Sequence, residues 1–214
     1  MPGGKTAMVK PGTMPSKNAS PQTNRREIDM KSAFASARRN VLRELDAVLA
    51  SVDEGLVERF AEEIHRAARI YTLGVGRSGL SVEGFAMRLM HLGYQAHCAD
   101  EVTAPAVGSD DLVITCSGSG STPTVVQLTD SARQAGARIV AVTSHPESEA
   151  ARLADLVVPL REYSADHEED RSAQFIGTLF EQGAYLFFDC VVLALQHTDQ
   201  VDEGEMFGRH TNLE

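Results

Sequence analysis

Hydroxyl side chains are concentrated in one short, glycine-containing stretch of the chain. Residues 117–122 read Ser-Gly-Ser-Gly-Ser-Thr, directly after the apolar run Leu112–Cys116 and before a segment of helical periodicity that starts at Val125. This order predicts a strand, a tight loop and the start of a helix. Small residues let backbone N–H groups approach an anion, and a helix N-terminus adds partial positive charge. The loop therefore suits a phosphate group, although a serine-rich turn with a helix cap would look the same.

A second glycine loop lies upstream, at the end of a predicted strand over residues 70–75. It reads Gly-Val-Gly-Arg-Ser-Gly at positions 74–79, which is the G-x-G-x-x-G spacing of dinucleotide-binding folds. Asp100 and Glu101 follow where such folds place the carboxylate that binds ribose. An NAD-dependent dehydrogenase is the weaker interpretation, because the chain ends soon after the fifth predicted strand and leaves little room for a catalytic domain. Two hydroxyl-bearing loops suit one compact phosphate better than a dinucleotide.

Short apolar runs alternate with helical segments after Arg69. The alternation predicts an α/β fold with a five-stranded parallel sheet, order 2-1-3-4-5, covered by helices on both faces. In that order the loops after the first and third strands are neighbours at the switch point, where ligands bind. The expected strands are residues 70–75, 96–99, 112–116, 138–143 and 156–160.

Long helices are expected at both ends of the sheet region. Apolar residues recur with helical spacing over residues 34–68, with a break at 51–53, which predicts two helices. The last long helix is expected over residues 173–197 and is apolar on several faces, so it should pack on the sheet and on another subunit. Its apolar run, 184–195, contains Asp189 and is too short to cross a bilayer.

Composition limits the classes of partner and compartment. Residues 1–31 contain four prolines and hardly any large apolar residues, so we expect a disordered tail before a single domain over 32–214. The formal net charge of −10 argues against nucleic acid as a partner. Three cysteines without metal-ligand spacing and a start without an apolar signal region indicate a cytoplasmic protein that is not attached to a membrane.

Four motifs together resemble the sugar isomerase (SIS) domain. They are the loops 74–79 and 117–122, the segment Phe-Ala-Met-Arg-Leu-Met-His-Leu-Gly at 85–93, and Gln-Phe-Ile-Gly-Thr-Leu-Phe-Glu at 174–181. The two helical motifs make the chain most similar to the 6-phospho-3-hexuloisomerases of the ribulose monophosphate pathway, which serves formaldehyde assimilation. The resemblance covers about residues 34–214 and leaves out the proline-rich tail.

The resemblance implies a homo-oligomeric isomerase, a dimer or tetramer, that uses no cofactor and no metal. Its reaction would interconvert D-arabino-3-hexulose 6-phosphate and fructose 6-phosphate. Arg77 would add a charge-assisted bond to the substrate. By motif position, the phosphate would be held by the loop hydroxyls, namely those of Ser78, Ser117, Ser119, Ser121 and Thr122.

Two further side chains are candidates for the proton transfers. Glu181, at the end of the Leu-Phe-Glu motif, is the candidate base that moves a proton between C2 and C3. His91 shares a helix stripe with Gly84 and Arg88 and is the candidate for exchange between O2 and O3, although a half-exposed histidine bonded to a backbone carbonyl is an equal alternative. His210 is the competing histidine and a candidate contribution from a second subunit. The other histidines lack metal-ligand spacing, so no metal is predicted.

Two other functions remain open on the sequence. One is another SIS-type sugar phosphate isomerase. The other is a non-catalytic sugar phosphate sensor, in which the two loops bind the ligand and the long helices signal to a partner. A sensor has no use for a base at Glu181, so this residue discriminates between the classes.

Overall fold

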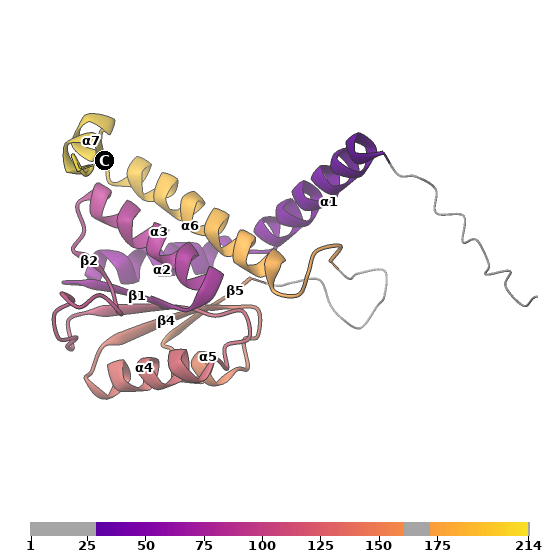
Figure 1. The fold of residues 1–214 in the computed structure, drawn as a ribbon. Helices are drawn as coiled ribbons and strands as arrows, with labels where there is room; N and C mark the ends of the chain where they lie inside the picture. The colour runs from indigo at the N-terminus through magenta and orange to yellow at the C-terminus, as the bar shows by residue number, and fades with distance from the viewer. Residues whose placement is uncertain (1–28, 161–171, 214) are drawn as a thin grey trace, which may run out of the picture.

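The computed structural model describes residues 29–160 and 172–213, which form a sheet between two helical layers (Figure 1). The sheet has five strands in the order β2-β1-β3-β4-β5, and each neighbouring pair is parallel. This confirms the predicted fold class and strand order. The strands are β1 (Ile70–Gly74), β2 (Ala96–Cys98), β3 (Leu112–Cys116), β4 (Arg138–Thr143) and β5 (Leu156–Pro159).

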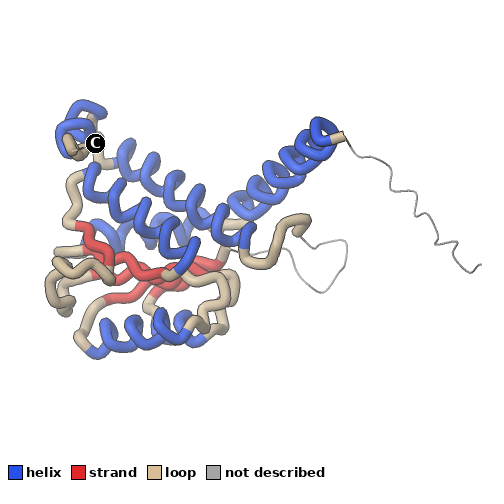
Figure 2. Tube along the Cα trace, viewed as in Figure 1, coloured by secondary structure: helices blue, strands red, loops and turns tan. Residues whose placement is uncertain are grey.

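Helices cover both faces of the sheet (Figure 2). One face carries the larger layer, in which α3 (Gly76–Leu92) and α6 (Thr178–Thr198) lie side by side, with α2 (Glu54–Arg66) beside them. The other face carries α4 (Pro123–Gln134) and the short α5 (Glu149–Leu153). The helix α1 (Met30–Ala50) packs on α6 by its C-terminal half and projects away from the body by its N-terminal half, while α7 (Glu203–Arg209) lies against α3.

Alternation along the strands divides the core into two parts. In β1, Ile70 faces the α3 and α6 layer, whereas Tyr71 and Leu73 face α4. Aromatic rings fill the larger part, and those of Phe85 and Phe188 stack with centroids 4.6 Å apart. This packing fixes α3 and α6 against each other, and the first turns of these two helices reach the same edge of the sheet.

Several element boundaries differ from the predicted ones. Strands β1, β2 and β5 each end one residue earlier, and α1 begins at Met30, inside the last residues of the predicted tail. The prediction of disorder for residues 1–28 lies outside the described residues. The predicted start of the last helix at residue 173 is wrong, because α6 begins at Thr178. Gly177 stands before it with φ of 85°, a left-handed conformation that interrupts a helix.

The helix α6 is longer than the apolar run 184–195, which was predicted to be too short to cross a bilayer. With 21 residues, it is long and apolar enough to span a membrane by length and composition alone. Half of its most apolar stretch is nevertheless buried, in contact with α3 and α1. A core helix of a globular domain has the same properties, and α6 occupies that position in this fold.

Candidate active site

The two glycine loops lie side by side at the carboxyl edge of the sheet. Strands β1 and β3 are paired in parallel, with Gly74 opposite Cys116, so the chain leaves both strands at the same place. Gly74 and Gly79 pack closely, because a Cβ atom on Gly74 would lie 2.9 Å from Gly79 Cα. The prediction that loops 74–79 and 117–122 would be neighbours is confirmed.

The helix α3 begins at Gly76, within residues 74–79, and α4 begins directly after residues 117–122; neither N-terminus has a side-chain cap. Val75 is the N-cap of α3 and has no group that could cap it. Thr122 is the N-cap of α4 but does not cap it; its Oγ1 lies 3.2 Å from the buried Ser117 Oγ. The amides of the first turn of a helix have no partner within the helix. Two such N-termini beside each other are suited to an anion.

Contacts from β4 and from the loop after it fix the shape of the serine loop. The carbonyl oxygen of Gly118 accepts hydrogen bonds from Thr143 Oγ1 at 3.1 Å and from Ser144 Oγ at 2.8 Å. Gly120 has φ of 59°, and a Cβ atom there would collide with Ser148 Oγ. The sequence analysis did not identify these supporting residues. Their position at the end of β4 and in the chain after it, at the same edge of the sheet, was the available signal.

The predicted hydroxyls differ in exposure. Ser117 is buried and its Oγ also accepts from the backbone N–H of Gly120 at 3.2 Å, so it shapes the loop from within. Ser119 and Ser121 are exposed, and the N–H of Ser121 donates to Ser119 Oγ at 3.3 Å. Ser78 and Thr122 are half-buried. A ligand at the loop edge would therefore meet Ser119 and Ser121 first.

Glu181 lies beside both loops, in the first turn of α6. Its Oε2 forms an ion pair with Arg77 Nε at 3.1 Å, and Ser81 Oγ donates to its backbone carbonyl at 3.0 Å. The preceding Phe180 packs against Gly118, where an added Cβ atom would lie 3.0 Å from Phe180 Cδ1. The structure thus places Glu181 beside Arg77 of the first loop, and the preceding Phe180 against Gly118 of the second.

The charge of Glu181 affects the pKa of Cys116, the last residue of β3. Burial, together with the negative charge of Glu181, raises the pKa of the Cys116 thiol, so this thiol is neutral. The carboxylate of Glu181 is 23% exposed, which leaves it accessible from the loop side. A half-buried carboxylate beside two helix N-termini is suited to exchanging a proton with a bound anionic substrate.

A buried carboxylate on α1 anchors the segment that leads into α6. Glu44 is 2% exposed and accepts from Ser172 Oγ at 2.7 Å and from the N–H of Ala173 at 3.0 Å. Burial alone would raise the pKa of Glu44, but these bonds and one from Gln174 outweigh it, and the pKa lies below its usual value. The anchor ties residues 172–174 to α1 and so helps to position Glu181. The sequence analysis did not identify Glu44.

The two candidate histidines lie away from this cluster. His91 is in the last turn of α3 and Arg77 in its first, which places them roughly 20 Å apart at 1.5 Å per residue. His91 is 3% exposed, so the half-exposed alternative is wrong. Arg88 Nη1 lies 3.5 Å from its Nδ1, and the ring of His210 stacks on it with centroids 5.2 Å apart. Within one chain, neither histidine meets Glu181.

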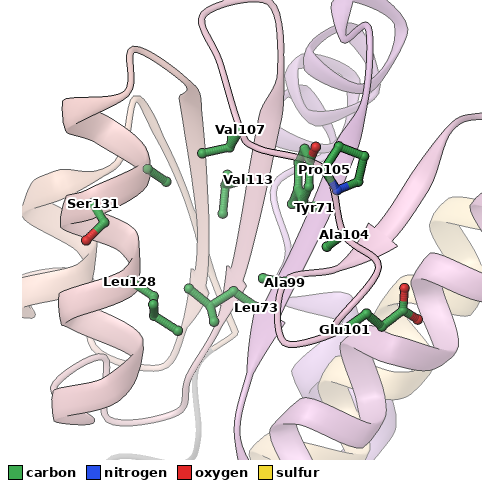
Figure 3. A pocket seen from close by; sticks show the side chains of 11 residues that line it. Tyr71, Leu73, Ala99, Glu101, Ala104, Pro105, Val107, Val113, Leu128 and Ser131 are labelled. Atoms are coloured by element: carbon green, nitrogen blue, oxygen red, sulfur yellow. The ribbon is translucent and has the colours of Figure 1, made fainter.

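A separate pocket of about 230 Å³ opens on the α4 face of the sheet (Figure 3). Its walls are mainly apolar, from β1, β3, α4 and the chain between β2 and β3, and Glu101 is its one charged lining residue. It contains none of the predicted phosphate-binding or proton-transfer residues. Within residues 29–160 and 172–213, no three His, Cys, Asp or Glu side chains gather as a metal site.

The chain is similar to known proteins both in sequence and in structure. The model of the SIS domain matches residues 63–182. A 3-hexulose-6-phosphate isomerase of Mycobacterium gastri is 41% identical over 166 residues, covering 77% of this chain and 83% of the relative. One of Bacillus subtilis strain 168 is 36% identical over 176 residues, covering 81% and 95%. A crystal structure of a hypothetical protein from Methanococcus jannaschii, for which a function of 3-hexulose-6-phosphate isomerase is inferred, has a TM-score of 0.71 and 32% identity, covering 85% of this chain and 99% of that one.

Proposed function

The chain belongs to the SIS domain family, and we propose that it is a 6-phospho-3-hexuloisomerase, the activity for which its relatives are named 3-hexulose-6-phosphate isomerase. The reaction interconverts D-arabino-3-hexulose 6-phosphate and fructose 6-phosphate. The observation that carries the proposal is the carboxylate of Glu181, which is paired with Arg77 at 3.1 Å beside two adjacent glycine-containing loops.

The phosphate group is assigned to the N-termini of α3 and α4. The chain has a formal net charge of −10, so a small anion must be held by local donors. Arg77 contributes the positive charge, and the first-turn amides contribute hydrogen bonds. The hydroxyls assigned to this site are those of Ser78, Ser117, Ser119, Ser121 and Thr122.

Glu181 is assigned as the base for the transfer between carbons. It takes the proton from C2 of the 3-ketose, the electrons form a 2,3-enediolate, and the carboxylic acid returns the proton to C3. One carboxylate serves both carbons if it faces one side of the planar intermediate. The hydroxyl proton must move from O2 to O3 in the same cycle, and a neutral histidine suits this exchange. No cofactor or metal is assigned to any step.

The histidines are assigned to the site of a neighbouring subunit in a homo-oligomer, a dimer or tetramer. His91 and His210 form one cluster at the far end of α3, roughly 20 Å along the helix from Arg77. The outer faces of α3 and α6 carry exposed apolar side chains that suit contact with a second copy. These side chains are Leu80, Met87, Leu186 and Leu193.

The proposed reaction fits the ribulose monophosphate pathway in the cytoplasm. Condensation of formaldehyde with ribulose 5-phosphate gives the 3-hexulose 6-phosphate, and isomerisation converts it into fructose 6-phosphate. The activity would therefore serve formaldehyde assimilation. The support for this placement is the similarity to relatives named 3-hexulose-6-phosphate isomerase.

A coupled assay tests the proposal. A separate synthase would form the substrate from ribulose 5-phosphate and formaldehyde, and auxiliary enzymes would convert fructose 6-phosphate into an NADPH signal. We expect turnover by the wild type and a loss of about 10²–10⁴-fold in kcat for Glu181→Gln. Glu58→Gln, an exposed carboxylate on α2, is the matched control and should keep its activity.

The assay also separates the alternatives. If the wild type shows no turnover but binds fructose 6-phosphate in a thermal shift assay, the protein would be a sugar phosphate sensor and not an enzyme. Turnover of other ketose phosphates only would indicate another isomerase of the same domain type.

A further inference from the structure

The ion pair between Arg77 and Glu181 occupies both of the charged side chains that the proposed reaction uses. Arg77 Nε lies 3.1 Å from Glu181 Oε2, and the pair joins the first turn of α3 to the first turn of α6. A carboxylate oxygen that accepts from a guanidinium is less able to take a proton from carbon. One oxygen of the proposed base is therefore engaged by Arg77.

The two partners differ in their freedom to move. Glu181 is 23% exposed, and its turn of α6 is held by the Ser81 hydrogen bond and by Phe180 against Gly118. Arg77 is 58% exposed and has a long, flexible side chain. Any separation of the pair is thus expected to come from Arg77. A phosphate at the neighbouring loop would attract the guanidinium, which matches phosphate geometry with two parallel donors.

We propose that Arg77 exchanges partners when the substrate binds. Its guanidinium leaves the carboxylate of Glu181 and binds the phosphate group at loop 117–122. The inference rests on the proposed isomerase function. It makes the phosphate a condition for proton abstraction, because Glu181 becomes free only when an anion holds Arg77. Arg77 is then a specificity-determining residue, since a sugar without phosphate leaves the base paired.

A thermodynamic cycle with inorganic phosphate tests the exchange without any turnover. Phosphate affinity would be measured by calorimetry for the wild type, Glu181→Gln, Arg77→Met and the double variant. If Glu181 and phosphate compete for Arg77, Glu181→Gln should bind phosphate about two- to fivefold more tightly than the wild type. In the Arg77→Met background, the same change at Glu181 should have almost no effect. Arg59→Met removes an exposed charge on α2 and is the matched control, with affinity expected to stay at the wild-type value.

The cycle separates competition from simple repulsion. An equal gain from Glu181→Gln with and without Arg77 would mean that Glu181 only repels phosphate, and would overturn the exchange. No gain in either background, or no phosphate binding by any of the four proteins, would also overturn it. Failure of the isomerase assignment would be visible elsewhere, as absence of turnover in the coupled assay.

A second experiment tests the consequence for the base. The substrate would be the 3-ketohexose without its phosphate, with phosphite dianion added as a separate piece and exchange at C2 followed by NMR. We expect phosphite to accelerate the wild type, and Arg77→Met to react faster than the wild type without phosphite and to gain nothing from it. Equal acceleration of both proteins, or none of the wild type, would contradict the proposal.

Discussion

The imidazole rings of His91 and His210 stack with their centroids 5.2 Å apart, which joins the last turn of α3 to the residue after α7. Arg209 strengthens the junction, since its Nη1 donates to the carbonyl oxygen of His91 at 3.0 Å. That carbonyl belongs to the last turn of α3, so the bond ties the end of α7 to the end of α3. The two histidines that the sequence presented as competitors therefore form one cluster, and changes at either should affect the other.

Mixed oligomers test whether this cluster serves a neighbouring subunit. Glu181→Gln and His91→Asn are each expected to lose activity, but hybrids of the two contain sites in which both residues are wild type. In a two-fold pair mixed at random, about a quarter of all sites are restored. Turnover after co-refolding of equal amounts measures this recovery.

The control uses two residues of the same site. Mixing Glu181→Gln with Arg77→Met should restore no activity, because the ion pair places both residues in one subunit. If the first mixture also stayed as inactive as its parents, the histidine cluster would have no role across a subunit contact.

The direction of the reaction tests the chemical role of His91. The 3-ketose 6-phosphate cannot close a favourable ring, whereas fructose 6-phosphate is mostly cyclic and must open before it reacts. If His91 assists ring opening, His91→Asn should reduce kcat for fructose 6-phosphate far more than kcat for the 3-ketose, with a difference of about tenfold or more. Initial rates in both directions decide the matter, and equal losses would count against ring opening.

Substitution of Gly120 tests the shape of the serine loop. Gly120→Ala places a methyl group against Ser148 Oγ at a residue with φ of 59°, so we expect a loss of about 1–3 kcal/mol in the free energy of unfolding. Phosphate affinity should fall with it. Gly208→Ala on α7 is the matched control, because nothing lies within 4 Å of its added Cβ atom. Urea unfolding of both variants provides the comparison, and similar losses in the two would contradict the steric argument.

The Glu44 anchor predicts a pH dependence of stability. The pKa of Glu44 is below its usual value in the folded chain, so the folded state binds fewer protons than the unfolded state as the pH falls. Its contribution is complete above about pH 5 and is lost as the pH falls through the lowered pKa. Urea unfolding between pH 7 and pH 3 should show a larger loss for the wild type than for Glu44→Gln.

The same variant separates the anchor from general acid unfolding. Glu44→Gln should lower stability at pH 7 and flatten only the acid part of the profile. A parallel profile for Glu58→Gln should follow the wild type, because Glu58 is exposed. If Glu44→Gln kept the full acid dependence of the wild type, the anchor would not be its source.

The sequence by itself determined the sheet and the edge of the sheet at which the two loops meet. Apolar runs of strand length, glycine loops and intervening helical periods are local properties, and each is readable without knowledge of the partner segment. The strand order 2-1-3-4-5 then predicted that loops 74–79 and 117–122 are neighbours at the switch point, where ligands bind. The structure agrees, with Gly74 opposite Cys116 in the paired strands.

Only the tertiary structure decided which side chains meet across long sequence separations. Three contacts are of this kind: the ion pair of Arg77 with Glu181, the stack of His91 on His210, and the bonds of Glu44 to residues 172–174. Their distances depend on how α1, α3, α6 and α7 pack. The later start of α6 is partly a tertiary effect, because Glu44 accepts hydrogen bonds from residues 172–174. Gly177, with φ of 85°, then stands directly before the helix, which begins at Thr178. Helical periodicity reports which face is apolar, but not which charged group will stand opposite it.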